Sequence, residues 1–240
     1  MSLSIITHKN VLLRILKDIF TDPVVGPVLG FKGGTAAYLF YGLNRFSVDL
    51  DFDLLDETRE EDVLGQIKKI LEIHGSVKDC RKKRYSLFYL LSYNDKERDA
   101  QNMKVEINKR EFGSRYELKS YLGIAMKVRV KEDMAAHKLV AMYERDGKSN
   151  RDIFDVQFFL HNNWPIRREI IERRTRLSFL EFLGKCIDIV EKKRERDILS
   201  GIGELVEEHQ KQWVRAKLKT EALFSLGLLR DNEKSRHAVL

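Results

Sequence analysis

The sequence predicts an α+β fold in which a mixed β-sheet with flanking helices is followed by a C-terminal helical bundle. Polar and apolar residues alternate at period two in residues 48–55 and again within residues 85–109, which is typical of strands with one buried face. Helical patterns precede and separate these segments. From Lys131 to the end of the chain the pattern is helical. We therefore expect two domains, residues 1–130 and residues 131–240.

The first expected elements are a helix, a strand, a glycine turn and a second helix. Thr7 is expected to cap a helix that continues to about Phe20, because apolar residues recur there at i, i+4 and i+8. Proline and glycine residues then break the chain. The apolar residues 28–31 predict a short strand that enters Gly33-Gly34-Thr35, and residues 36–41 predict a helix.

The later elements follow from charge and turn patterns. Thr58 to His74 is expected to be a helix, since its acidic first turn and late lysines match the helix dipole, and Gly75 is a natural stop. A hairpin is expected over residues 85–109, with its turn at Asn94-Asp95-Lys96, and a short strand over Ala125 to Val130. Breaks between the C-terminal helices are expected near Gly147 to Asn150, Trp164-Pro165 and Ser200 to Gly203.

The composition limits the class of protein. The 240 residues are 43% hydrophobic, which is enough to bury a core. Cys80 and Cys186 fit neither a disulfide framework nor a CxxC site, and the histidines lack ligand spacing, so zinc is not expected. The first residues lack a signal-peptide pattern, and no stretch reaches the ~18 to 20 apolar residues of a membrane span, so we expect a cytoplasmic protein without a membrane partner. The net charge of +7 favours polyanions such as nucleic acid.

An acidic row is the strongest chemical signal. Ser47, Asp49, Asp51 and Asp53 are spaced two apart, so on a strand they share one face. Carboxylates brought this close repel one another, and a divalent cation relieves the repulsion while providing the oxygen coordination that Mg²⁺ prefers. The alternative is an exposed edge strand whose aspartates prevent aggregation.

The glycine turn before the acidic row narrows the possible functions. A Gly33-Gly34-Thr35 turn that opens a helix offers backbone N–H groups and a positive dipole end to a phosphate. A Gly-Gly turn, a helix and an Asp-x-Asp strand in this order resemble the nucleotidyltransferase superfamily. Residues 31–37, with residues 41–53, are similar in detail to the AbiEii toxin family, the nucleotidyltransferase half of bacterial toxin–antitoxin and phage-defence pairs.

A second block supports the same resemblance. Residues 138–145, a loop containing Gly147 and residues 151–160 are similar to the family's downstream lysine and Arg-Asp-x-x-Asp motifs. The resemblance implies a nucleotidyltransferase-like sheet and assigns roles to individual residues. Asp49 and Asp51 would be catalytic metal ligands. Lys138 and Asp152 would complete the active site, and Lys138 would bind the triphosphate. The residues expected to bind the nucleotide are Gly33, Gly34, Thr35 and Ser47. Without the resemblance, Lys138 reads as a solvated lysine and Asp152 as a helix-start aspartate.

Other acidic and basic residues leave alternatives open. Glu106 is the candidate third metal ligand, because the superfamily commonly has a carboxylate on a later strand. It would equally suit a surface ion pair with Lys104 or Arg110. Asp53 and Asp155 are candidates for orienting neighbouring ligands or bases. The basic residues 81–84 suit either a nucleic-acid phosphate or a solvated turn.

The resemblance also implies a reaction. A metal-dependent nucleotidyltransferase with Mg²⁺ as cofactor would move a nucleotide from GTP or another NTP to an acceptor, suggested to be RNA and in particular the 3′ end of tRNA. It would act as the toxin of a pair, with an antitoxin protein as partner. The alternatives are a catalytically inactive module that binds nucleotide, RNA or a partner on the same fold, and a kinase-like phosphotransferase.

Overall fold

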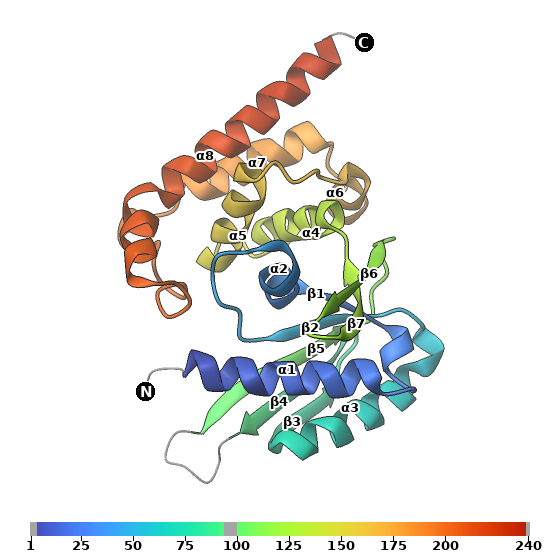
Figure 1. Cartoon of the computed structure of the whole chain (residues 1–240). Coiled ribbons are helices and arrows are strands. Elements are labelled where there is room, and N and C mark those ends of the chain that lie inside the picture. The colour runs from blue at the N-terminus through green and yellow to red at the C-terminus, as the bar shows by residue number, and fades with distance from the viewer. Residues whose placement is uncertain (1–3, 94–99, 239–240) are drawn as a thin grey trace. The chain divides into compact units, whose positions relative to one another are not determined.

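A computed structural model describes residues 4–93 and 100–238 (Figure 1). The chain forms two compact units. The first, here called the sheet unit, comprises Met1–Gly42, Phe46–Glu111 and Arg115–Arg129. The second, the helical unit, comprises Leu43–Arg45, Phe112–Ser114 and Val130–Leu240. Two short connecting segments therefore belong with the C-terminal helices.

The described part of the sheet unit contains one mixed sheet of seven strands in the order β3-β4-β5-β2-β1-β7-β6. Strand β1 is antiparallel to β2 and parallel to β7, and β2 is parallel to β5. The remaining neighbours are antiparallel. The strands are β1 (Leu29–Lys32), β2 (Leu50–Leu54), β3 (Ser76–Lys82), β4 (Ser86–Tyr93), β5 (Gln101–Asn108), β6 (Tyr116–Tyr121) and β7 (Ile124–Arg129).

Two helices cover the apolar face of this sheet. Helices α1 (Ile5–Thr21) and α3 (Glu60–His74) lie side by side along it (Figure 1). Phe20 at the end of α1 packs its ring against Phe52 of β2 with 6.0 Å between centroids. The hydroxyl of Tyr89 on β4 donates to the Leu64 carbonyl of α3 at 3.0 Å. Because alternate strand residues face opposite sides, the residues between these apolar ones form a polar face.

Shorter elements connect these parts of the sheet unit. A 3-10 turn, η1 (Gly26–Val28), precedes β1, and helix α2 (Gly33–Tyr41) follows it. Gly42 ends α2 in the left-handed conformation with φ of 73°, as is common at helix C-termini. A second 3-10 turn, η2 (Glu57–Arg59), leads into α3.

The helical unit is a bundle. Helix α4 packs against α5, α6 and α7, and α8 packs against α5 and α7. Its core contains large apolar side chains from several helices, such as Phe154, Phe159 and Phe182, each at most 2% exposed. The elements are α4 (Lys131–Glu144), α5 (Asn150–His161), α6 (Arg168–Thr175), α7 (Phe179–Glu191), η3 (Glu195–Asp197) and α8 (Glu208–Ala238).

The structure confirms the predicted fold class and corrects details of it. The first helix begins at Ile5 with Ser4 as its N-cap, so the prediction of Thr7 as the cap was wrong. The predicted hairpin is β4 and β5, and the expected turn at residues 94–96 lies outside the described residues. Strands β3 and β6 were not predicted. None of the described helices has the length and apolar character needed to cross a lipid bilayer.

Candidate active site

The glycine turn lies directly against the acidic strand. Gly33 adopts φ of +78°, a conformation that favours glycine. A Cβ atom at Gly33 would lie 2.5 Å from Oδ2 of Asp51 and 2.9 Å from its Cβ. Both the backbone conformation and the available space therefore require glycine here. The close approach brings the start of α2 and the Asp51 carboxylate together.

The first turn of α2 also fixes the segment that carries Asp49. The buried hydroxyl of Thr35 donates to the Asp49 carbonyl at 2.5 Å. Ser47, two residues earlier, is 7% exposed. The Lys32 side chain, at the N-cap position, makes no capping hydrogen bond to α2. The helix start at Gly33 and Gly34 therefore presents backbone N–H groups next to two aspartates, as in anion-binding helix termini.

A second carboxylate lies beside Asp51 on the neighbouring strand. Asp51 and Glu106 are register partners in the parallel β2–β5 pair, so their side chains leave the sheet on the same face. Lys104 bonds Glu106 at 2.5 Å, and the Ser86 hydroxyl donates to Glu106 at 2.9 Å. Burial would raise the pKa of Glu106, but the bonded Lys104 ammonium outweighs it and lowers the pKa. The alternative of an ion pair with Lys104 is thus present in the structure.

The oxygen donors of this region suit magnesium. Mg²⁺ is usually held by one or two carboxylates together with waters and substrate phosphates, rather than by a cage of protein ligands. Asp51 supplies one carboxylate at the glycine turn, and the segment that carries Asp49 is bonded to the same turn through its backbone carbonyl. In the described ranges, no three His, Cys, Asp or Glu side chains are gathered so as to hold an ion by themselves. These residues fit an ion shared with a nucleotide, and the roles of Asp49, Asp51 and Glu106 as metal ligands stay predictions.

Asp53 has a different environment from Asp51, although both occupy β2. Its carboxylate accepts hydrogen bonds from Lys32 at 2.7 Å, Asn108 at 2.9 Å, Tyr116 and Arg129. Burial would raise the pKa of Asp53, but the charges of Arg129 and Lys32 hold it well below its usual range. Asp53 is 5% exposed. It therefore joins β2 to four other strands of the sheet, namely β1, β5, β6 and β7.

Lys138 belongs to a charged cluster in the helical unit. Its Nζ lies 3.1 Å from Asp152 Oδ1 and 3.0 Å from Asp155 Oδ2. Arg45 donates to both oxygens of Asp155, at 2.6 and 2.7 Å, and Arg145 pairs with Asp152 at 2.8 Å. Burial would lower the pKa of Lys138, yet the two carboxylates raise it, so the side chain stays charged. Lys138 and Asp152 are therefore neighbours, as an antiparallel helix pair allows.

The residues predicted from sequence fall into two groups. Within the sheet unit lie the nucleotide and metal candidates, namely Gly33, Gly34, Thr35, Ser47, Asp49, Asp51 and Glu106. Within the helical unit lie Lys138 and Asp152. The ion pairs formed by Lys32, Arg45 and Arg129 were not predicted. The only local signal was their place beside the motifs: Lys32 precedes the glycine turn, Arg45 precedes Ser47, and Arg129 ends the last strand.

Comparison with known families decides which enzymes this arrangement belongs to. The model of the nucleotidyl transferase AbiEii toxin of type IV toxin–antitoxin systems matches residues 14–225. The chain belongs to this family. The match includes the glycine turn, the acidic strand and the Lys138 cluster. As an AbiEii protein, the chain is a toxin nucleotidyltransferase, which confirms the family and the enzyme class predicted from the sequence.

Solved structures share the AbiEii protein's fold. JHP933 from Helicobacter pylori is 24% identical, with a TM-score of 0.61, and the match covers 100% of this chain and 97% of that one. MenT4, the nucleotidyltransferase toxin Rv2826c from Mycobacterium tuberculosis H37Rv, is 20% identical, with a TM-score of 0.53 and 92% of each chain covered. At these identities the likeness supports the fold. A comparison with curated protein sequences gives no match.

Proposed function

We propose that this AbiEii protein is a Mg²⁺-dependent enzyme that transfers a nucleotide from GTP or another NTP to RNA, with the 3′ end of tRNA as the favoured acceptor. It acts in the cytoplasm as the toxin that an antitoxin protein restrains. The observation that carries the proposal is the contact between the Gly33 turn and Asp51, because it joins a phosphate-binding helix start to a carboxylate. The net charge of +7 supports a polyanionic acceptor.

The proposed reaction divides the work among residues of the sheet unit. The acceptor hydroxyl attacks the α-phosphorus of the triphosphate, and pyrophosphate leaves. The N–H groups at Gly33 and Gly34 bind phosphate oxygens, while Asp49 and Asp51 hold Mg²⁺. When bound, Mg²⁺ supplies positive charge that offsets charge on the phosphates. Thr35 and the Asp53 cluster position these groups through the contacts described above.

Lys138 is assigned to the leaving pyrophosphate, and its replacement gives a specific prediction. In Lys138→Ala, Asp155 keeps Arg45 and Asp152 keeps Arg145, so the fold is expected to persist. Transfer, measured as kcat/KM for the NTP, is expected to fall on the order of 10²-fold, as when one electrostatic contact to a transition state is lost. Lys148→Ala is the matched control, since Lys148 is exposed. Kinetics equal to those of the control would place Lys138 outside the active site.

One experiment tests the reaction itself. The protein is incubated with each labelled NTP and total RNA, with Mg²⁺ or with a chelator. We expect label in small RNA only with Mg²⁺, and an RNA mass increase equal to a nucleotide residue. A phosphoryl increase would instead support the kinase-like alternative. Absence of any adduct with every NTP would favour the inactive binding module.

A further inference from the structure

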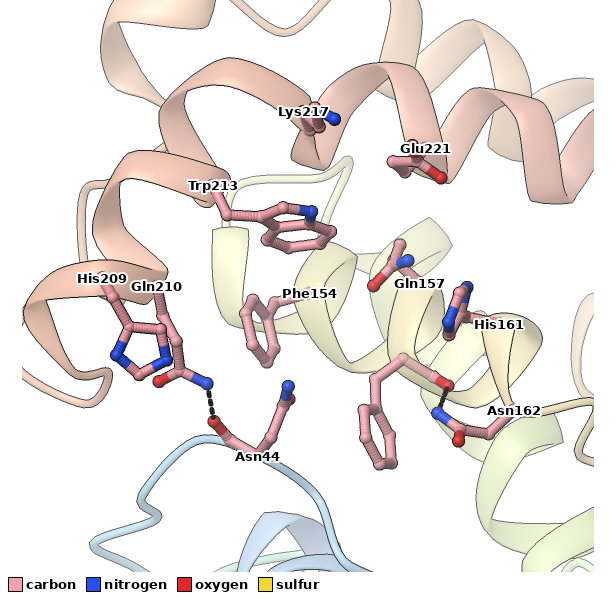
Figure 2. Close-up of a pocket in the computed structure, with 11 residues that line it drawn as sticks. Asn44, Phe154, Gln157, His161, Asn162, His209, Gln210, Trp213, Lys217 and Glu221 are labelled. Carbon is pink, nitrogen blue, oxygen red and sulfur yellow. Dashed lines mark hydrogen bonds between the residues drawn. The ribbon is translucent and has the colours of Figure 1, made fainter.

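The helical unit contains a pocket that the proposed reaction does not use. It has a volume of about 560 Å³ and lies between α5 and the first half of α8, with Asn44 at its border (Figure 2). The side chain of Gln210 on α8 donates to the Asn44 carbonyl at 2.8 Å, which fixes that border. All residues that line the pocket belong to the helical unit.

The side-chain amide of Gln157 is open to this pocket. Gln157 on α5 is only 6% exposed. Within residues 4–93 and 100–238, no group forms a hydrogen bond with its side chain, and its amide atoms are not closed off from the pocket. Figure 2 shows the Gln157 amide and the Trp213 indole both at the hollow between α5 and α8. A ligand that both donates and accepts hydrogen bonds would satisfy the amide.

Aromatic rings form the apolar part of the same pocket. Trp213 of α8 meets Phe154 of α5 edge to face, with 6.2 Å between the ring centroids and 87° between their planes. Phe158, one helical turn beyond Phe154, also lines the pocket. Flat unsaturated ligands stack on such rings. A ligand with a planar ring and a hydrogen-bonding edge therefore matches both the amide and the aromatic residues.

The cationic side chain of Lys217 lies at the edge of the pocket. Lys217 lies one turn after Trp213 on α8 and is exposed, and the described chain gives its ammonium no ion pair. A phosphate attached to a ligand in the pocket would neutralise it. The amide matches the hydrogen-bonding edge of a nucleobase, the aromatic rings match its flat face, and the cation matches the phosphate of the nucleotide.

We propose that this pocket binds an unpaired nucleobase of the RNA acceptor, with Gln157 on the base edge, Trp213 against the ring and Lys217 on the adjacent phosphate. The proposal rests on the proposed function in one respect, namely that RNA is the acceptor. It adds a second nucleotide-binding site, outside the catalytic residues, that selects strands with an unstacked base.

The position of the pocket on α5 argues against the donor nucleotide as its ligand. Successive residues of a helix are rotated by about 100°. Asp152 and Asp155, which hold Lys138, therefore lie on nearly the opposite side of α5 from Gln157. A triphosphate on Lys138 would have to wrap around the helix to place its own base in the pocket. The base of a separate strand has no such restriction.

Fluorescence of the full-length protein tests the proposal without any turnover. Trp164 is 6% exposed and stacked on Phe159 at 4.1 Å, so quenching by a ligand reports mainly on Trp213. The Asp49→Ala protein is titrated with a short single-stranded RNA, an abasic strand of equal length and charge, and each mononucleotide. We expect the RNA to quench the emission and to bind about 10-fold more tightly than the abasic strand, as for one stacked base.

Variants of the amide complete the test. Gln157→Ala and the similarly sized Gln157→Glu are expected to weaken RNA binding about 5-fold or more, whereas Gln212→Ala, at an exposed position on α8, is expected to have no effect. Thermal melts show which variants are folded. Equal binding of RNA and abasic strand, or equal affinity of the Gln157 and Gln212 variants, would overturn the proposal. Mononucleotides that bind as tightly as RNA would overturn the assignment to the acceptor.

The assay separates this proposal from the proposed function. RNA binding that depends on Gln157 in a protein that transfers no nucleotide would retain the base pocket and refute the enzyme reaction. Transfer to RNA with unchanged kinetics in both Gln157 variants would support the enzyme reaction and refute the base pocket.

Discussion

Replacing Asp49 with alanine is expected to abolish nucleotide transfer and to leave the free energy of unfolding almost unchanged. The change removes one of the two carboxylates assigned to Mg²⁺. It keeps the Asp49 backbone carbonyl, which accepts the Thr35 hydrogen bond that positions the segment. The initial rate of labelled NTP incorporation should fall at least on the order of 10²- to 10³-fold, the cost of losing a single transition-state contact. Urea denaturation of the same preparation measures stability.

A matched aspartate separates loss of the site from loss of charge. Asp62 is exposed in the first turn of α3 and pairs with Arg59 at 2.8 Å. Asp62→Ala therefore removes the same charge from the sheet unit and should transfer nucleotide at the original rate. In cells, expression of the unaltered toxin without its antitoxin should arrest growth, and the Asp49→Ala variant should not. Transfer retained by a pure Asp49→Ala protein would refute the central assignment.

The sequence was sufficient for features whose cause is local. The glycine turn, the helix after it and the acidic strand could each be predicted from their own residues, because short-range chemistry restricts each part. The partners of Asp53 do not follow in this way. Period two places Asp51 and Asp53 on one face, but Lys32 and Arg129 reach Asp53 from two other strands. The order of the strands decides which aspartate is paired with protein cations, and strand order cannot be predicted from a local sequence pattern.

Strands β3 and β6 escape prediction from the sequence for one physical reason, namely that neither contains a buried residue. Strands β3 and β6 are the edges of the described sheet. In β3 no residue is fully buried, and the strand carries Lys78, Asp79, Arg81 and Lys82. An edge strand with this composition avoids aggregation but loses the apolar alternation by which strands are predicted. The central strands β2 and β5 keep that alternation because α1 and α3 cover one of their faces.

Asp155→Asn is expected to destabilise the helical unit strongly. Asp155 is fully buried and accepts two hydrogen bonds from Arg45, itself 4% exposed, while Lys138 lies 3.0 Å away. Asparagine keeps the size of the side chain but leaves two cations without their shared counter-charge. Breaking a buried pair by removing one partner costs about 3–5 kcal/mol. Urea denaturation at neutral pH measures the loss, with Asp188→Asn, an exposed aspartate on α7, as the control.

The pH dependence of stability identifies the charge of Asp155 as the cause. Burial would raise the pKa of Asp155, but Arg45 and Lys138 outweigh it and lower the pKa below the usual 3.8. A carboxyl whose pKa is lowered by folding stabilises the protein fully above its unfolded pKa and loses that contribution as the pH falls through the folded pKa. The unaltered protein should therefore lose its greater stability over Asp155→Asn as the pH falls below 3.8 and through the lowered pKa of folded Asp155. A stability difference that stays constant down to strongly acid pH would instead indicate that asparagine disturbs packing, because packing does not depend on protonation.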